Sequence, residues 1–524
     1  MNDDMKAGSA GIGAKGRGSR DAYLYAALAM VLVSTLYWSA FALNAYSTFH
    51  EYNDLGAYAY SLYYDLHYPS AAHGLQYIIF GNHISPDELL FLPIFYISQS
   101  ALTLLFIQAL VVSLAGLAAF GAARRVTGSG AFAMLLCAAV LLNPGLHGIT
   151  VFDFHVEMLF PLLFIAAFYF YVRMMRLWFY AASVLLVGVI EEAPFLGIAL
   201  GMALAAHALL NHADAEERRA RLRMAYGLLA LSAAAFLLYY AASGYINGQY
   251  AAGAYPLLPQ GLRYDSSLSG VASGLGLGQA APHTTTYTLM THGSASMVYY
   301  ALLIIVLGLG VLSVFVPVET LLLLSPWLAE TFLVGNFQFV YIFNQYFAYV
   351  IGGMAVAAIL GAKALMERKG RLANALWQAA GAATPKVVAY ASVISIAVIL
   401  MLSPIFIYSR NVNSMTQDFL FQVSPSQQRI YAQLYSVMDQ VPPNASLMAQ
   451  YYMMPHVFAR RYFETTARAD YFFRSQYILL DDNLNISLNV LNLGYHGFYA
   501  FYMNNTYNYT VAAENGTAVL YVRR

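Results

Sequence analysis

The positively charged residues of this sequence lie almost entirely on alternate connections between long apolar runs. When those runs are taken as membrane spans, seventeen of the eighteen Lys and Arg residues in residues 1–408 fall on one side. Arg263 alone falls on the other side. Because Lys- and Arg-rich loops of membrane proteins stay in the cytoplasm, this distribution predicts a multi-pass protein of the plasma membrane with a cytoplasmic N-terminus.

The composition agrees with a membrane protein. The chain is 60% hydrophobic and 10% charged, whereas a soluble globular protein carries about 25% charged residues. Its formal net charge is +0, so no nucleic-acid partner is implied. Cys137 is the only cysteine, which excludes an intrachain disulfide and a cysteine-based metal site.

Eleven apolar runs are candidates for membrane spans, since about 20 apolar residues cross a bilayer. With a cytoplasmic N-terminus, an odd number of spans places the C-terminus outside. The runs at 129–144 and 177–191 are short for a span. The predicted spans are 22–43, 100–123, 129–144, 156–172, 177–191, 194–211, 224–243, 297–315, 318–335, 339–362 and 387–408.

We therefore expect an all-α membrane domain at 21–408, after a disordered basic tail at 1–20 and before a small extracytoplasmic α/β domain at 409–524. The last region contains five Asn-x-Ser/Thr acceptors, which are modified only on a translocated surface; they begin at Asn444, Asn485, Asn504, Asn508 and Asn515. We predict a helix at 427–440 and strands at 446–450 and 476–480 there.

Two predicted outer loops are long enough to suggest function. The loop at 44–99 is rich in Tyr, Leu and Phe and should fold as interfacial helices. The loop at 244–296 contains a Gly-, Ser- and Thr-rich stretch at 266–286 that is typical of a mobile lid.

Two residues of the first outer loop stand out. Asp54, in Asn53-Asp54-Leu55-Gly56, is either a base or metal ligand near an apolar surface or an ordinary turn residue, and local sequence favours the turn. Ser85 and the acids that follow Pro86 are explained as the start of a helix. That explanation leaves His83 unaccounted for.

The strongest cluster of polar residues is the segment Phe152-Asp153-Phe154-His155-Val156-Glu157. On a helix, Asp153 and Glu157 share a face. In an extended chain, Asp153, His155 and Glu157 share one face and the apolar residues take the other. Both conformations bring oxygen and imidazole groups together in an apolar setting, which suits a divalent metal or proton transfer.

Other polar residues carry weaker signals. Glu191 and Glu192 are adjacent acids at a membrane edge, Glu319 and Glu330 lie in or beside spans, and Gln345 and Tyr346 belong to an amide-rich stretch that suits interhelical hydrogen bonds. For a phosphate, the outer side offers Arg263 and the segment from His456 to Arg460 and Arg461. No phosphate loop, dinucleotide fingerprint, HExxH or serine-nucleophile elbow is present.

Together, Asp54-Leu55-Gly56, His83, Asp153-Phe154-His155-x-Glu157 and the outer Tyr477–Asp481 segment resemble the predicted membrane proteins of domain-of-unknown-function family 2079. That family resembles the GT-C superfamily of membrane glycosyltransferases, which use a polyprenyl-phosphate sugar donor. The resemblance implies Asp54 as the general base. Glu191-Glu192 stands where family members often carry a Lys-Glu-Asp-like stretch, and the missing lysine argues against a phosphate-binding role at that position.

The leading hypothesis is a GT-C-like glycosyltransferase that moves a sugar from a polyprenyl-phosphate donor to an unidentified acceptor on the outer face of the membrane. His83, Asp153, His155 and Glu157 would bind a divalent cation, Mg²⁺ or Mn²⁺, or orient Asp54. The alternatives are a transporter or flippase of a polar lipid or ion and a non-catalytic surface-assembly protein. A transporter would need acids along a route across the bilayer rather than at one face.

Overall fold

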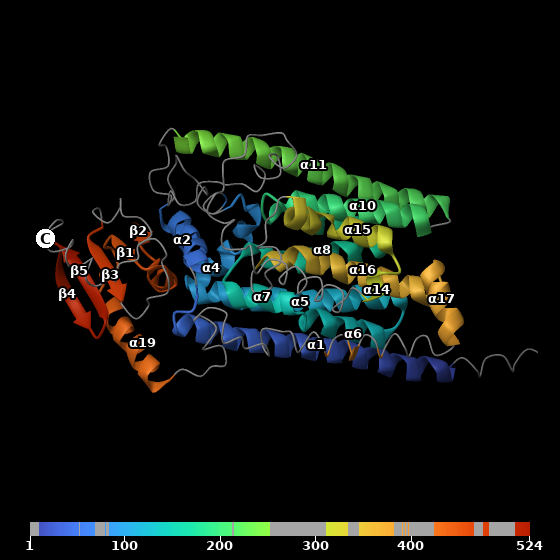
Figure 1. The fold of residues 1–524 in the computed structure, drawn as a ribbon, viewed down its shortest axis with the longest axis horizontal. Coiled ribbons are helices and arrows are strands. Elements are labelled where there is room, and N and C mark those ends of the chain that lie inside the picture. The colour runs from blue at the N-terminus through green and yellow to red at the C-terminus, as the bar shows by residue number, and fades with distance from the viewer. Residues whose placement is uncertain are drawn as a thin grey trace, which may run out of the picture.

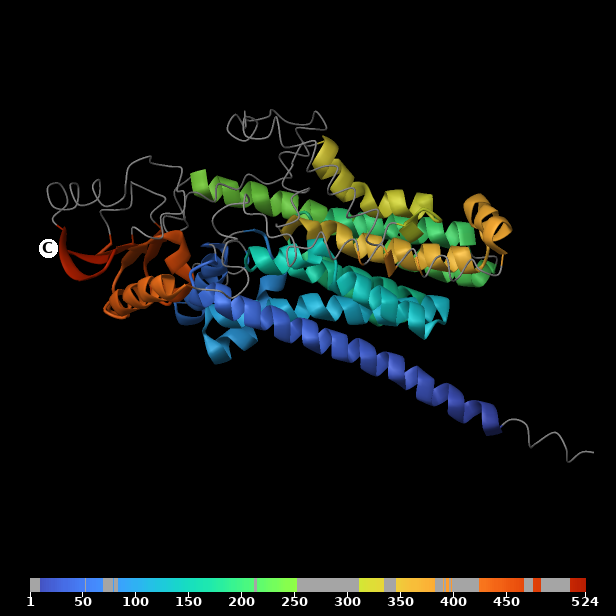
Figure 2. The ribbon, with the colours of Figure 1, turned by 60° about the horizontal axis from the view of Figure 1, so that its bottom comes forward.

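Long apolar helices lie side by side in a bundle, and a small sheet stands at one end of it (Figure 1). This computed structural model describes residues 10–51, 53–68, 79, 83–211, 214–251, 311–333, 345–381, 390, 393–394, 397, 424–465, 475–481 and 509–524. Figure 2, turned by 60°, again shows the sheet beyond the end of the bundle.

The bundle is built from helices whose apolar residues form one continuous core. They are α1 (Ala10–Ser47), α2 (Asn53–His67), α4 (Leu92–Ser98), α5 (Ala101–Thr127), α6 (Gly130–Leu141), α7 (Pro144–Phe152), α8 (Leu159–Val172), α9 (Arg176–Gly188), α10 (Ala193–Asn211), α11 (Ala215–Ala251), α14 (Val311–Ser313), α15 (Pro317–Leu328), α16 (Ala348–Met366) and α17 (Arg371–Ala380). Short turns of helix are η1 (Pro86–Leu90), η2 (Val156–Met158), η4 (Ala329–Leu333) and η6 (Gln345–Phe347).

Five of the described helical segments are long and apolar enough to cross a membrane. They are Ala22–Ser47, Ala101–Thr127, Ala193–Asn211, Ala215–Ala242 and Gln345–Met366, and α6 with α7, bent by 41°, makes a sixth if the pair is one broken span. Val156–Val172 and Arg176–Gly188 are shorter apolar helices. The multi-pass character is thus confirmed. The count of eleven stays a prediction, since the predicted spans at 297–315 and 387–408 lie largely outside the described residues.

Two predicted unstructured regions are partly helical. Residues 10–20, which we expected to be disordered, form the first turns of α1. Residues 244–251 of the predicted lid loop continue α11. In both places a membrane helix extends beyond its apolar stretch, because each added residue gains a backbone hydrogen bond once the helix is nucleated. The rest of that loop, with Arg263, lies outside the described residues.

The helix ends that carry the basic residues lie together, away from the sheet. Figure 1 shows α17 and the beginning of α1 at that end. Successive helices run in opposite directions, so α5 ends there with Arg124 and Arg125, and α11 begins there before Arg218. The one-sided charge in the sequence therefore corresponds to one end of the molecule.

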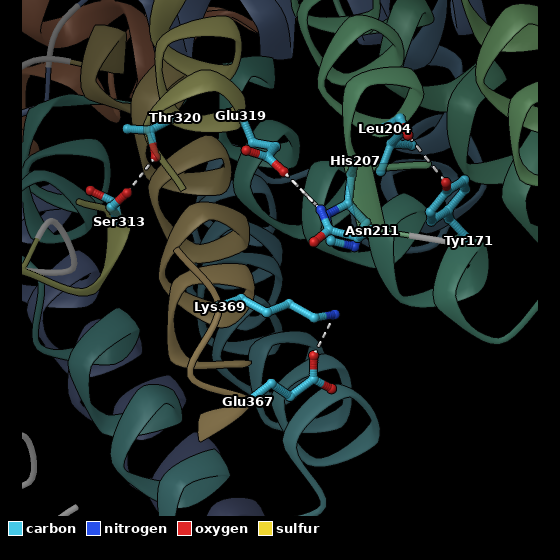
Figure 3. Close-up of polar contacts among 9 residues, drawn as sticks. All are labelled: Tyr171, Leu204, His207, Asn211, Ser313, Glu319, Thr320, Glu367 and Lys369. Carbon is cyan, nitrogen blue, oxygen red and sulfur yellow. Dashed lines mark hydrogen bonds and ion pairs between the residues drawn. The ribbon is translucent and has the colours of Figure 1, made fainter. Parts of the chain in front are cut away.

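Polar side chains near this end join three helices (Figure 3). The Nδ1 atom of His207 on α10 lies 3.3 Å from Oε1 of Glu319 on α15. Asn211, one turn beyond His207, donates from Nδ2 to the same carboxylate at 3.4 Å. The hydroxyl of Tyr171 on α8 donates to the carbonyl of Leu204 at 3.2 Å. These bonds pair polar groups that would be costly to bury alone.

The C-terminal region forms a five-stranded mixed sheet in the order β2-β1-β3-β5-β4. Its strands are β1 (Leu447–Ala449), β2 (Phe463–Thr465), β3 (Tyr477–Asp481), β4 (Tyr509–Asn515) and β5 (Ala518–Arg523). β1 is parallel to β2 and β3, whereas β5 is antiparallel to β3 and β4. The predicted helix and two strands correspond to α19 (Pro425–Met438), β1 and β3.

Helix α2 connects this domain to the bundle. It packs against α20 (Met454–Val457), which follows η9 (Tyr451–Met453). The contact is close at Gly56, where an added Cβ would lie 2.4 Å from Cγ of Met454. Beside it, Phe49 stacks on His456 with ring centroids 4.4 Å apart. The glycine of the Asp-Leu-Gly motif is therefore explained by packing between the two domains.

Candidate functional site

Asp54 lies in the first turn of α2, at the end of the bundle nearest the sheet. Its Oδ2 atom is 3.2 Å from Nε2 of His155. The Asp54 side chain is 28% exposed, whereas the His155 side chain is 3% exposed. The carboxylate is thus oriented by a buried imidazole and remains accessible to a substrate.

The segment that follows α7 is extended, which was one of the two predicted conformations. Asp153 has φ −177° and ψ −180°, and His155 has φ −143° and ψ 140°. Their side chains therefore share one face of the chain. Phe154 points the other way and packs edge-on against Tyr58 and Phe91, at centroid distances of 5.2 and 5.5 Å. Glu157 follows in the turn η2.

Asp153 joins this segment to the start of α2. Its Oδ2 accepts a hydrogen bond from the backbone N–H of Leu55 at 3.1 Å, and its Oδ1 accepts one from the N–H of Phe154 at 2.8 Å. The first N–H groups of a helix lack partners within the helix, so a carboxylate there stabilises the helix and fixes its position. Asp153 therefore sets where Asp54 stands.

Gln108 on α5 supports the same segment and was not identified from the sequence. Its Nε2 donates to the carbonyls of Ile149 and Asp153 at 3.1 and 3.0 Å. Its Oε1 accepts from the N–H of His155 at 3.1 Å. One amide thus satisfies three backbone groups of a buried, non-helical stretch.

Glu51 is a second carboxyl group that the sequence analysis missed. It is buried, and its side chain hydrogen-bonds that of Asp153. Burial raises the pKa of Glu51 to about 8, against a smaller lowering effect of that hydrogen bond. Burial and the charges of Glu51 and Asp54 also raise the pKa of Asp153. A bond between two carboxyl groups requires a proton on one of them, which these raised pKa values supply.

Asp54 itself is kept ionised. Burial acts to raise its pKa, but the hydrogen bond and charge of His155, together with the charge of His83, bring the pKa of Asp54 below its usual value. In return, burial acts to lower the pKa of His155, and the contact with Asp54 outweighs it and raises that pKa. Each partner therefore stabilises the charged form of the other.

His83 forms a neighbouring cluster with Glu191 and Glu192, in the connection between α9 and α10. His83 Nδ1 lies 2.9 Å from Oε1 of Glu191, whose Oε2 accepts from the N–H of Ile84 at 3.1 Å. One ligand atom from each of His83, Glu191 and Glu192 lies within 4.8 Å of the others. Burial acts to lower the pKa of His83, but Glu191 and weaker effects of other acids raise it to about 10.

The acids after Pro86 lie in the first turn of η1, as the predicted helix start requires, and both are buried. Ser85 takes the position before η1, but its hydroxyl makes no capping bond. Asp87 packs against the helix end at Gly188, where an added Cβ would lie 2.4 Å from its Oδ1. Burial raises the pKa of Asp87 to about 7. Burial and Asp65 raise the pKa of Glu88.

A metal bound by Asp153, His155 and Glu157 does not fit this geometry. Both oxygens of Asp153 accept backbone N–H groups, and Nε2 of His155 faces Asp54. Among the residues described, the group of three whose ligand atoms converge is His83, Glu191 and Glu192. Asp153 and His155 instead position Asp54, which was the other predicted role. Both oxygens of the fully buried Glu157 lack a hydrogen-bond partner within the described part of the chain.

The predicted phosphate-binding arginines lie along the second half of α2. Arg460 is buried, and its guanidinium donates to the carbonyls of Val457 and Ala445 at 2.6 and 3.3 Å. Arg461 is exposed and stacks 5.7 Å from the ring centroid of Tyr68. A helix rises about 1.5 Å per residue, so Tyr68 is roughly 20 Å along the chain axis from Asp54. The phosphate role of these arginines stays a prediction.

The remaining predicted residues fall into two groups. His456 lies in the interface between α1 and the C-terminal domain, where Tyr46 stacks on it at a centroid distance of 4.1 Å. Burial lowers the pKa of His456 to about 3, so it is neutral.

Gln345 and Tyr346 lie in η6. Tyr346 is close enough to Glu157, Glu192 and Asp54 to interact electrostatically with them. Tyr346 is therefore part of the surroundings of the Asp54 site.

Several of the described carboxylates gather at one end of the bundle. Asp54, Asp153, Glu157, Glu191 and Glu192 influence one another or the same histidines. Glu319 lies near the opposite end, where His207 and Asn211 bond to it (Figure 3). The buried Glu330 of η4 stands about three helical turns along the chain from Glu319, and the choice between a reaction site and a transport path stays a prediction.

The raised pKa values predict that the protein loses stability as the pH rises. Folded Glu51 and folded His83 keep protons at pH values where the unfolded chain has released them. These two groups should therefore make the free energy of unfolding fall with pH, Glu51 between about pH 4.5 and 8 and His83 between about pH 6.5 and 10. His456, whose folded pKa is about 3, acts in the opposite direction below about pH 6.5. Melting temperatures of the purified protein from pH 5 to 10 test this. Relative to the wild type, Glu51→Gln should lose the fall in stability between about pH 4.5 and 8, and His83→Gln the fall between about pH 6.5 and 10. Variants whose pH dependence equals that of the wild type would contradict the assignment.

Comparison with known proteins adds one match. The family described as "Predicted membrane protein (DUF2079)" matches residues 32–495, which include every residue of the site above. No curated protein matches the chain.

Proposed function

Because this chain belongs to the DUF2079 family of predicted membrane proteins, and because its carboxylates converge beside the start of α2, we propose that it is an integral-membrane glycosyltransferase of the GT-C type. The observation that carries the proposal is Asp54: a partly exposed carboxylate, paired with the buried His155. Its low pKa keeps it ready to accept a proton across the physiological pH range.

The proposed reaction moves a sugar from a polyprenyl-phosphate donor to an acceptor hydroxyl. Asp54 takes the proton of that hydroxyl while its oxygen attacks the anomeric carbon. The bond between the anomeric carbon and the phosphate oxygen breaks, and polyprenyl phosphate leaves with the electron pair. The configuration at the anomeric carbon is inverted. His155 keeps Asp54 in place, and Asp153 with Gln108 keeps the helix start in place.

The proposed orientation places the Asp54 site on the outer face of the plasma membrane. The chain would span the membrane eleven times, with its N-terminus in the cytoplasm and its C-terminal domain outside. The basic helix ends at the other end of the bundle support this orientation. So do Asn444 and Asn515, two of the sequence acceptors for glycans, which are exposed on the C-terminal domain. A lipid-linked donor would then enter sideways from the outer leaflet.

The proposal is tested by reconstituting the full chain in vesicles with a panel of polyprenyl-phosphate sugars, among them mannose, glucose and arabinose carriers. Release of polyprenyl phosphate with transfer of the labelled sugar to an added membrane extract is the expected result. Movement of intact donor between leaflets, with no cleavage, would support a flippase instead. If no donor is cleaved and none is moved between leaflets, the proposal is contradicted.

His155 should act as a positioning residue, and its replacement should change the pH profile. His155→Gln keeps a polar side chain but removes the positive charge that lowers the pKa of Asp54. We expect transfer to fall by about 10- to 100-fold through misplacement of Asp54. The acid limb of the rate profile should move to higher pH, because the charge of His83 alone then opposes the effect of burial on Asp54.

The matched control is His67→Gln, which changes the exposed histidine near the end of the same helix, where it bonds Gln99 at 2.9 Å. It should leave both the rate and the pH profile as in the wild type. An unchanged pH profile in His155→Gln, even with a slower rate, would show that His155 does not set the ionisation of Asp54.

A further inference from the structure

We propose that His83, Glu191 and Glu192 bind a divalent cation, Mn²⁺ or Zn²⁺, at a site adjacent to the Asp54–His155 pair. This set differs from the Asp153–Glu157 segment in which the sequence suggested a metal. The existence of the site does not depend on the reaction. Its role, neutralising the phosphate that leaves the sugar, rests on the proposed function.

The three side chains already have the spacing of a ligand set. One nitrogen and two carboxylate oxygens lie within 4.8 Å of one another. Metal–ligand bonds of about 2.0–2.2 Å place neighbouring ligand atoms roughly 3 Å apart and opposite ones roughly 4 Å apart. His83 Nδ1 and Glu191 Oε1 are 2.9 Å apart. Small rotations of the side chains are therefore enough to surround an ion.

The backbone fixes these ligands before any ion arrives. Glu191 is tied to the first outer loop through the N–H of Ile84. The carbonyl of Glu192 accepts the N–H of Phe195 at 3.0 Å, at the start of α10. The adjacent acids thus sit in a tight connection between two packed helices. Such support for the ligands is what a metal site needs in order to bind with little reorganisation.

Glu157 gives independent support for a cation here. It is fully buried, and neither of its oxygens has a hydrogen-bond partner among the described residues. Its charge acts on His83, so the carboxylate lies near this cluster. A buried carboxylate without hydrogen bonds is costly unless a positive charge compensates it. A cation between Glu191 and Glu192 would supply that charge.

Lys and Arg supply no compensating charge in the surrounding segments, and the nearby imidazoles of His83 and His155 already face Glu191 and Asp54. Residues 44–99, 143–172 and 177–217 contain no Lys or Arg. Glu51 and Asp153 hydrogen-bond each other through a shared proton, and Asp153 also accepts the N–H of Leu55 at the start of α2. This pair therefore needs no cation. The remaining excess of acids lies around His83. Two carboxylates with one imidazole suit Mn²⁺ or Zn²⁺, whereas Mg²⁺ and Ca²⁺ prefer oxygen ligands alone.

The test measures metal on the full-length protein without any sugar donor. Purified protein in lipid nanodiscs is stripped with EDTA, incubated with Mn²⁺ or Zn²⁺, desalted and analysed by mass spectrometry of the metal. Titration calorimetry gives the affinity. The wild type should keep about one ion per chain, and Glu191→Gln and Glu192→Gln should each bind at least about tenfold more weakly.

Glu330→Gln is the matched control, because it removes another buried carboxyl, in η4, that belongs to no such cluster. It should bind the ion like the wild type. Size-exclusion profiles and melting temperatures identify any variant that fails to fold. If one of the two cluster variants fails to fold, the other one still tests the site. No uptake by the wild type, or wild-type affinity in both cluster variants, would overturn the site and leave His83 and Glu191 as an ion pair only.

The outcome is separable from that of the proposed function. If the ion binds but no polyprenyl-phosphate sugar is cleaved, the metal site stands and the glycosyltransferase proposal fails. If Asp54→Asn abolishes transfer and no ion binds, the glycosyltransferase proposal stands and the metal site fails.

Discussion

Replacing Asp54 with asparagine is expected to lower sugar transfer by roughly 10²- to 10⁴-fold, the usual contribution of a general base. Asparagine has almost the same shape and keeps an oxygen that can accept a hydrogen bond from His155, but it cannot take the proton of an acceptor hydroxyl. Binding of the lipid donor should change little, since Asp54 is proposed to act on the acceptor. The measurement is transfer of labelled sugar in proteoliposomes, with kcat and KM determined separately.

The matched control is Asp65→Asn, which removes a buried carboxyl from the same helix about three turns away. That variant should keep the wild-type rate. A melting temperature close to that of the wild type is expected for Asp54→Asn, because the backbone contacts at the start of α2 come from Asp153. Transfer at the wild-type rate by Asp54→Asn would exclude Asp54 as the base.

Gly56→Ala should destabilise the protein by about 1–3 kcal/mol, the range for overpacked contacts. The new Cβ would lie 2.4 Å from Cγ and 3.0 Å from the backbone carbonyl carbon of Met454. Rotation of the Met454 side chain relieves the first contact but not the second, so the C-terminal domain must move. Thermal unfolding and limited proteolysis of that domain are the measurements, and transfer should fall with the displacement of α2.

The same substitution at Gly121 tests whether the effect is steric. Gly121 lies in the interior of α5, and an added Cβ would meet the ring of Tyr169 at 3.6 Å, an ordinary contact. Alanine is favoured over glycine within a helix by roughly 0.5–1 kcal/mol, so Gly121→Ala should be neutral or stabilising. If Gly56→Ala were to stabilise the protein as well, the close approach of α2 and α20 would be wrong.

The membrane bundle could be predicted because its signals are local. Length and apolarity identify a span within one segment, and the basic residues of each connection identify its side. The C-terminal helix α19 and strands β1 and β3 were predicted from similar local patterns. The end of the predicted tail and the start of the predicted lid were misplaced, because helix propagation continues beyond the apolar residues that identify a span.

The site was predicted only in part, because its contacts join distant positions. Asp54, Asp153 and His155 could be selected from their residue types and aromatic neighbours. The bond from Asp153 to Leu55 spans 98 residues, and the contact of His83 with Glu191 spans 108 residues. No pattern in a single sequence contains such pairings. Gln108 was missed because it stands in an apolar span, and Glu51 because nothing near it suggested burial.

The first half of helix α2 contacts two different parts of the molecule. Its start is bonded to Asp153 of the bundle, while Gly56 and the hydroxyl of Tyr60, which donates to the carbonyl of Arg461 at 3.1 Å, belong to the contact with the C-terminal domain. Helix α2 therefore couples the position of the C-terminal domain to that of the bundle. A ligand or antibody that moves the C-terminal domain would move α2 and carry Asp54 away from His155, so this pair can be disturbed without contact to either residue.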